Sequence, residues 1–103
     1  MATDRHIYGE VRSKTDMKRV FGAIRRDVAN ARSRPALTEL YKRAGYLITL
    51  TYAPSWEEKF GSDASALRRI GKAEFSKTAK KINRRAAQIG TAADFDEKWG
   101  DGR

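Results

Sequence analysis

The chain has 103 residues, which is enough for one domain with a small core and too few for two. It is 40% hydrophobic and 34% charged, and its 22 Lys and Arg against 13 Asp and Glu give a formal net charge of +9. Such a charge favours polyanionic or acidic partners and says nothing about the fold. We expect a single small basic domain over residues 1–103, with frayed ends at residues 1–4 and 100–103.

Several classes of site are excluded by composition. The chain has no cysteine and a single histidine, His6, so disulfides, thiolate catalysis and imidazole-rich metal centres are excluded. We expect no metal and no cofactor. The longest apolar stretch, residues 46–53, is too short and too polar to span a bilayer, and residues 1–6 have no apolar signal region. These features predict a cytoplasmic protein without membrane contact.

The first half of the chain predicts an arm and two helices. Residues 5–11 favour a short edge strand or an ordered arm. Ser13, with Asp16 three residues on, or Thr15 alone is a suitable N-cap for the first helix. The apolar residues of this helix recur at three- and four-residue steps, namely Met17, Val20, Phe21, Ile24, Val28 and Ala31. Pro35 stops this helix and starts a second one, for which Gly45 is a suitable C-terminal stop.

The stretch after Gly45 predicts a strand. Residues 46–53 are dense in aromatic and β-branched side chains, which is typical of β-structure. One strand leaves its backbone groups unpaired, so it must pair with residues 5–11 or with the same strand of a second subunit. Because the arm contains Gly9 near the terminus, we expect a homodimer formed through this strand.

The second half predicts further helices. The run from Ser55 to Glu58 is a capping box for a short helix that ends at Gly61. Residues 64–89 are helical in composition, with a break near Gly71. After this break the buried stripe is Phe75, Thr78, Ala79, Ile82, Ala86 and Ile89, and Gly90 follows as a stop. Thr91 then caps a last short helix with Phe95 and Trp99.

These elements define an α+β fold that is mainly helical. Its predicted order is a short N-terminal strand or arm, two helices, one strong strand (46–53), and then two to three helices.

The strongest functional signal is a basic run in the late helix. One acid, Glu74, stands among eight cations in residues 68–85, and these cations are the predicted nucleic-acid contacts: Arg68, Arg69, Lys72, Lys77, Lys80, Lys81, Arg84 and Arg85. A secondary basic surface is predicted on the first helix, at Lys18, Arg19, Arg25 and Arg26. The alternative is a solvated face whose surplus charge serves solubility.

Residues 75–89 also resemble the helix-turn-helix arrangement of small phage repressors. Ala79, Ile82, Asn83 and Ile89 match its small, apolar, turn and later apolar positions, whereas Arg84 stands where a buried residue is expected. The resemblance implies a turn at Asn83. The unbroken apolar periodicity favours a continuous helix instead.

These observations predict a non-catalytic nucleic-acid-binding protein, such as a dimeric regulator or accessory factor. The alternative is a protein-interaction module, an adaptor or inhibitor that docks on an acidic protein. Some of the aromatic residues could stack on unpaired bases, but most are better explained as core. No nucleophile motif or phosphate loop is present, so an enzyme is not expected. A toxin-type ribonuclease is the remaining enzymatic alternative, by analogy with a strand-helix-helix-strand opening.

Overall fold

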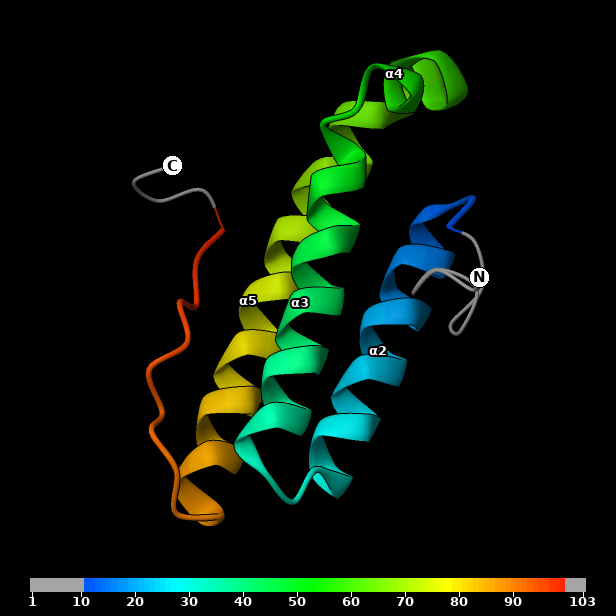
Figure 1. Ribbon diagram of the computed structural model, residues 1–103. Helices are drawn as coiled ribbons and strands as arrows, with labels where there is room; N and C mark the ends of the chain where they lie inside the picture. The colour runs from blue at the N-terminus through cyan, green and yellow to red at the C-terminus, as the bar shows by residue number, and fades with distance from the viewer. Residues whose placement is uncertain (1–10, 100–103) are drawn as a thin grey trace, which may run out of the picture.

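The computed structural model describes residues 11–99, which form an elongated three-helix bundle measuring 44 × 31 × 23 Å (Figure 1). The three long helices are α2 (Lys14–Asn30), α3 (Arg34–Thr51) and α5 (Ala64–Gln88). A short helix, α4 (Pro54–Phe60), and a 3-10 turn (Gly61–Asp63) join α3 to α5 at one end of the bundle. No strand occurs in this part of the chain.

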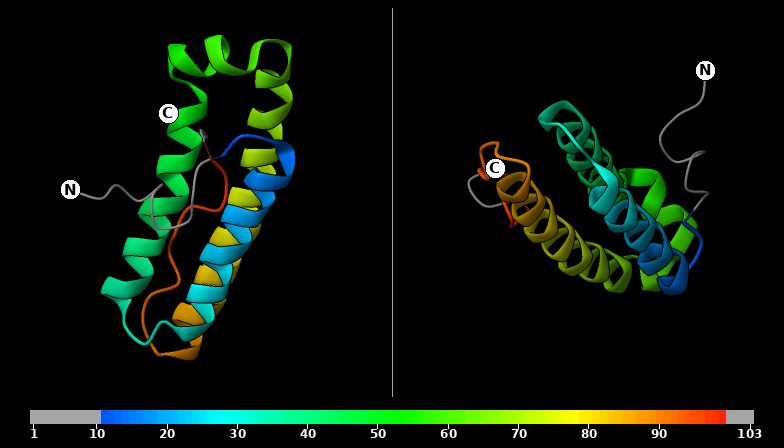
Figure 2. Two further views of the ribbon diagram at one scale, coloured as in Figure 1. Left: turned by 90° about the vertical axis from the view of Figure 1, so that its right-hand side faces the viewer. Right: turned by 90° about the horizontal axis from the view of Figure 1, so that it is seen from below.

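The order of the helices sets their directions. Helix α2 runs down the bundle, α3 returns, and α5 runs down again, so α2 and α5 are parallel and α3 is antiparallel to both (Figure 1). Residues 91–99 then climb back along the other side of α5, away from α2 (Figure 2). This segment of residues 91–99 therefore covers α5 on the side away from α2.

The core lies where the apolar stripes of the three long helices meet. Its fully buried large side chains come from all three: Met17, Phe21 and Ile24 from α2, Leu37 and Ile48 from α3, and Leu67, Phe75 and Ile82 from α5. The predicted late stripe is confirmed, since Phe75, Thr78, Ala79, Ile82 and Ala86 are buried and Ile89 is partly buried. Lys77, Lys80 and Arg84 of the same helix are exposed.

The expected helix starts are confirmed in part. The Ser13 hydroxyl accepts a hydrogen bond from the backbone N–H of Asp16, and Pro35 stands in the first turn of α3. The capping box at Ser55 is wrong: α4 begins at Pro54 and has no side-chain cap, although it does end at Gly61, whose φ of 52° favours glycine.

The predicted strand is wrong, because residues 46–51 are the last turns of α3. Leu47, Ile48 and Thr51 extend the stripe of Leu37, Leu40 and Ala44 at three- and four-residue steps, so burial favours the helix over the local β-propensity. The threonine hydroxyls donate to carbonyls of the same helix, Thr49 to Gly45 and Thr51 to Ile48. The α+β class falls with this strand, and so does the reason for expecting a strand-paired homodimer.

The predicted break near Gly71 is also wrong, because α5 continues through it without interruption. Gly71 is needed for close packing: a Cβ there would lie 3.1 Å from Cδ1 of Ile48 and 3.6 Å from Cε of Met17. The same continuity excludes the helix-turn-helix interpretation of residues 75–89 and confirms the continuous helix.

The predicted last helix does not form, since residues 92–96 have no regular secondary structure. We call residues 91–99 the C-terminal strap. Asn83 holds its backbone: the side-chain amide donates to the Phe95 carbonyl and its oxygen accepts from the Phe95 N–H. Trp99 packs edge-on against Phe75, which covers the α3–α5 groove. The predicted strand or arm at residues 5–11 falls almost wholly outside the described residues.

Candidate nucleic-acid interface

The parallel helices α2 and α5 pack in a regular register. Near their beginnings Met17 faces Gly71, in the middle Arg25 donates to the Thr78 hydroxyl, and at the end Arg85 donates to the Ala31 carbonyl. The separation in sequence is 53 or 54 residues in each case. This register places particular side chains of α2 and α5 opposite one another.

On α2, Lys18 and Arg25 occupy the side that faces α5, and a third cation lies beside them. Arg25 contacts α5 directly, and Lys18 lies seven residues earlier, which is two helical turns and therefore the same face. Arg26 is the third, since a Cβ at Gly22 would lie 3.9 Å from guanidinium nitrogens of both Arg25 and Arg26. Gly22 and Ala29, which lie between these cations, are too small to cover them.

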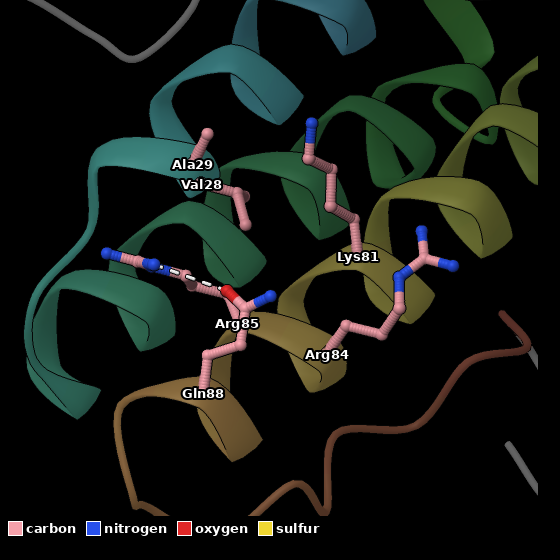
Figure 3. A pocket seen from close by; sticks show the side chains of 6 residues that line it. All are labelled: Val28, Ala29, Lys81, Arg84, Arg85 and Gln88. Carbon is pink, nitrogen blue, oxygen red and sulfur yellow. Dashed lines mark hydrogen bonds between the residues drawn. The ribbon is translucent and has the colours of Figure 1, made fainter.

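On α5, Lys77, Lys81 and Arg84 follow one another at four- and three-residue steps and so share one face. Lys81 and Arg84 line a recess of about 230 Å³ with Val28 and Ala29 of α2 (Figure 3). Its volume lies below the range of ordinary small-molecule sites.

We call these six cations the basic face: Lys18, Arg25, Arg26, Lys77, Lys81 and Arg84. In Figure 3 the side chain of Lys81 projects from α5 toward α2, the side chain of Arg84 extends away from Val28 and Ala29, and Arg85 is turned toward Gln88, to which it donates a hydrogen bond. Within residues 11–99, four of the six have no hydrogen-bond or ion-pair partner, namely Lys18, Arg26, Lys81 and Arg84. These four are available to an anion from solution.

The other two members share one buried carboxylate. Arg25 lies 2.9 Å from Glu74 Oε1, and Lys77 donates to Glu74 Oε2 at 3.2 Å. Glu74 is 4% exposed, whereas the Lys77 side chain is 66% exposed. Thr78 completes the cluster by accepting from Arg25 and donating to the Glu74 carbonyl. The buried carboxylate of Glu74 therefore contacts one cation of α2 and one cation of α5.

The remaining predicted contacts lie elsewhere and mostly serve the fold. Arg68 donates twice to the Thr51 carbonyl and once to Glu57, so it caps the C-terminal end of α3. Lys72 lies over the ring of Tyr52. Arg85 satisfies the Ala31 carbonyl just after α2. Three of the eight predicted contacts thus make intramolecular contacts within the fold, which the charge pattern alone did not indicate.

The other three predicted residues are exposed outside the basic face. Lys80 stands between Lys77 and Arg84 along α5 but lies on the side of the helix turned away from Lys81, and Arg69 lies three turns earlier on that side. Arg19 of the secondary surface pairs with Asp16. The structure therefore brings together Lys77, Lys81 and Arg84 with Lys18, Arg25 and Arg26, and separates the rest.

The other two flanks of the bundle carry acids. Asp27 and Glu39 line a second recess, of about 380 Å³, between α2 and α3. The strap brings Asp94, Asp96 and Glu97 to the α3–α5 side, where Asp94 pairs with Arg34. Helix α5 contains no acid other than Glu74. Within residues 11–99, the α2–α5 flank is thus the one whose exposed charges are all positive.

Two features were not predicted from the sequence, namely the burial of Glu74 and the contacts of Asn83 with the strap. The burial of Glu74 was detectable, because Glu74 lies seven residues after Leu67 and four before Thr78, on the buried stripe of α5. The role of Asn83 in holding the strap had no local signal, since it depends on a segment 12 residues away adopting an extended path.

No family model, no curated protein and no solved structure matches this chain. Among the described residues, no group of His, Cys, Asp and Glu side chains is arranged to hold a metal ion. In the same region no helix has the length and apolar character of a membrane span.

Proposed function

We propose that the protein is a non-catalytic nucleic-acid-binding protein whose basic face takes the phosphate backbone. The observation that carries this proposal is a group of cations from two helices, Lys18 and Arg26 on α2 and Lys81 and Arg84 on α5, which have no partner within residues 11–99 and lie on a flank where these residues place no exposed carboxylate. Cations that already pair within the fold gain little from a phosphate, whereas these release condensed counterions when the polymer binds.

The chemistry of the basic face favours backbone contact over base recognition. The residues at its centre are Gly22 and Ala29. The aromatic residues of the two helices, Phe21 and Phe75, are fully buried. A strand bound through stacked bases needs exposed aromatic rings, and Tyr52, 50% exposed, lies just after α3 beside Arg68 and Lys72, outside the basic face. We therefore expect binding to duplexes with little dependence on sequence.

The direct test is a salt titration of duplex binding. Fluorescence anisotropy with a labelled 20-base-pair duplex compares the wild type with a variant carrying Lys18→Gln, Arg26→Gln, Lys81→Gln and Arg84→Gln. We expect the variant to bind about 100-fold more weakly at low salt. Its slope of log affinity against log salt should fall by roughly one unit for every cation that no longer meets a phosphate.

A matched variant controls for net charge. It replaces four exposed cations away from the basic face: Arg32→Gln, Lys42→Gln, Lys59→Gln and Lys98→Gln. The proposal predicts that this variant keeps most of the affinity, because only long-range attraction is lost. Equal losses in the two variants would show that the net charge, and not the basic face, drives binding.

The second candidate function is docking on an acidic protein through the same cations. The observation that favours it is the strong charge segregation of the bundle, which orients any acidic surface as well as a phosphate chain. The two functions separate in one experiment. A protein that binds no duplex or single-stranded oligonucleotide at low salt, yet binds one acidic protein tightly, would overturn the nucleic-acid proposal.

A further inference from the structure

Glu74 is the one anion beneath the basic face. It lies between α2 and α5 with 4% of its surface exposed, and its two carboxylate oxygens contact one cation from each helix, Arg25 and Lys77. Every other acid of the described bundle lies on a different flank, in the strap, or in the α4 region. The single acid of the basic run is thus placed where it acts on the candidate binding surface.

The packing of the bundle does not explain a carboxylate at this position. A buried carboxylate loses its hydration, and ion pairs recover this cost incompletely, so apolar residues of similar volume often replace buried pairs without loss of stability. The contact of Arg25 with Oε1 is electrostatic and lacks the alignment of a hydrogen bond. A carboxylate that is costly to bury and that contacts one cation from each of the two helices suggests a role at the surface.

We propose that Glu74 is a positioning residue and a built-in counter-anion of the basic face, which limits its affinity for phosphate. This inference rests on the proposed function. Glu74 holds Arg25 and Lys77 against α5 and cancels part of their charge, so the attraction is left mainly to the four partner-free cations. The basic face then binds the polymer through many weak contacts and releases it readily.

The distances support this effect. Lys77 Nζ lies 3.2 Å from Glu74 Oε2, and a phosphate oxygen bound to the same ammonium group would lie about 3 Å from the nitrogen. The phosphate and the carboxylate would therefore be within roughly 6–7 Å of each other, which is shorter than the screening length of about 8 Å at physiological salt. Repulsion at this distance acts on each phosphate that reaches Lys77.

The experiment removes the charge at constant shape. Glu74→Gln keeps the size of the side chain and an oxygen for Arg25, and Glu39→Gln makes the same change of net charge on the α2–α3 side. Binding of the 20-base-pair duplex is measured by anisotropy across a salt titration. We expect Glu74→Gln to bind about 5- to 10-fold more tightly with a steeper salt slope, and Glu39→Gln to change affinity less than about twofold.

Each outcome decides between specific claims. Equal affinity gains in the two variants, or no gain in Glu74→Gln, would overturn the role of Glu74 while leaving the basic face intact. Absence of duplex binding in the wild type and both variants would overturn the proposed function and this inference together. If circular dichroism shows that Glu74→Gln is unfolded, Glu74→Met makes the same comparison with an apolar chain of similar volume.

Discussion

The two grooves that flank α5 differ in cover and charge. The groove on the α3 side is covered by the strap, whose Phe95 and Trp99 pack on Tyr41 and Phe75. The α2 side holds the recess beside Lys81 and Arg84, whose charges find no partner in the described chain. One helix thus has a face built for packing and a face left for a ligand.

The cations of the basic run in residues 68–85 therefore do not act as one functional unit. Arg68 and Arg85 satisfy carbonyls near the ends of α3 and α2, while Lys81 and Arg84, close in sequence to Arg85, have no polar partner within residues 11–99. Successive side chains of a helix point about 100° apart, so cations that are neighbours in sequence face different surroundings. The phase of a cation on its helix therefore matters more than the local charge density.

The largest expected effect comes from the core that both grooves share. Ile82 is fully buried on α5, so Ile82→Asp places an unpaired charge among apolar side chains and should cost about 3 kcal/mol or more of unfolding free energy. Thermal unfolding by circular dichroism measures the loss. Lys80→Asp, exposed on the same helix, is the control and should change stability by under about 0.5 kcal/mol. Unchanged stability of Ile82→Asp would contradict the packing of α5.

A smaller effect is expected on the strap side alone. Asn83→Ala removes the two hydrogen bonds to the Phe95 backbone and one to Glu97, and should cost about 2 kcal/mol because the strap must rehydrate. Denaturant unfolding measures the cost, and hydrogen exchange at the Phe95 amide reports release of the strap. Duplex binding should be unchanged. A large loss of binding would show that the two sides of α5 are coupled and do not act independently.

The smallest effect separates the adjacent arginines 84 and 85. Arg85→Gln removes the hydrogen bond to the Ala31 carbonyl and should lower stability by about 1 kcal/mol. Arg84→Gln should leave stability unchanged and weaken duplex binding several-fold with a shallower salt slope. Thermal denaturation and anisotropy on both variants give the comparison. The opposite pattern would reverse the assignment of the two cations.

Local sequence signals predicted much of the bundle. Ser13 and Pro35 marked helix starts, Gly61 and Gly90 marked helix ends, and the spacing of Phe75, Ala79 and Ile82 located the buried stripe of α5. These features depend on residues a few positions apart, where periodicity and capping chemistry are reliable.

The failures arose where distant contacts decide the structure. Residues 46–51 have β-propensity, yet Leu47 and Ile48 complete the α3 stripe against the core, so tertiary packing overrides composition. Gly71 looked like a break because its close neighbours, Met17 and Ile48, lie in other helices. The cations of the basic face were identified from the sequence. Which of them lie together depends on the α2–α5 register, which the sequence did not predict.

Amide chemical-shift mapping by NMR tests most directly whether duplexes bind at the basic face. The 15N-labelled protein is titrated with an unlabelled 20-base-pair duplex. The account predicts the largest shifts at Lys18, Gly22, Arg26, Lys81 and Arg84, with little change at Glu39 or Phe95. Shifts centred on the α2–α3 recess or on the strap, or no shifts at low salt, would contradict it.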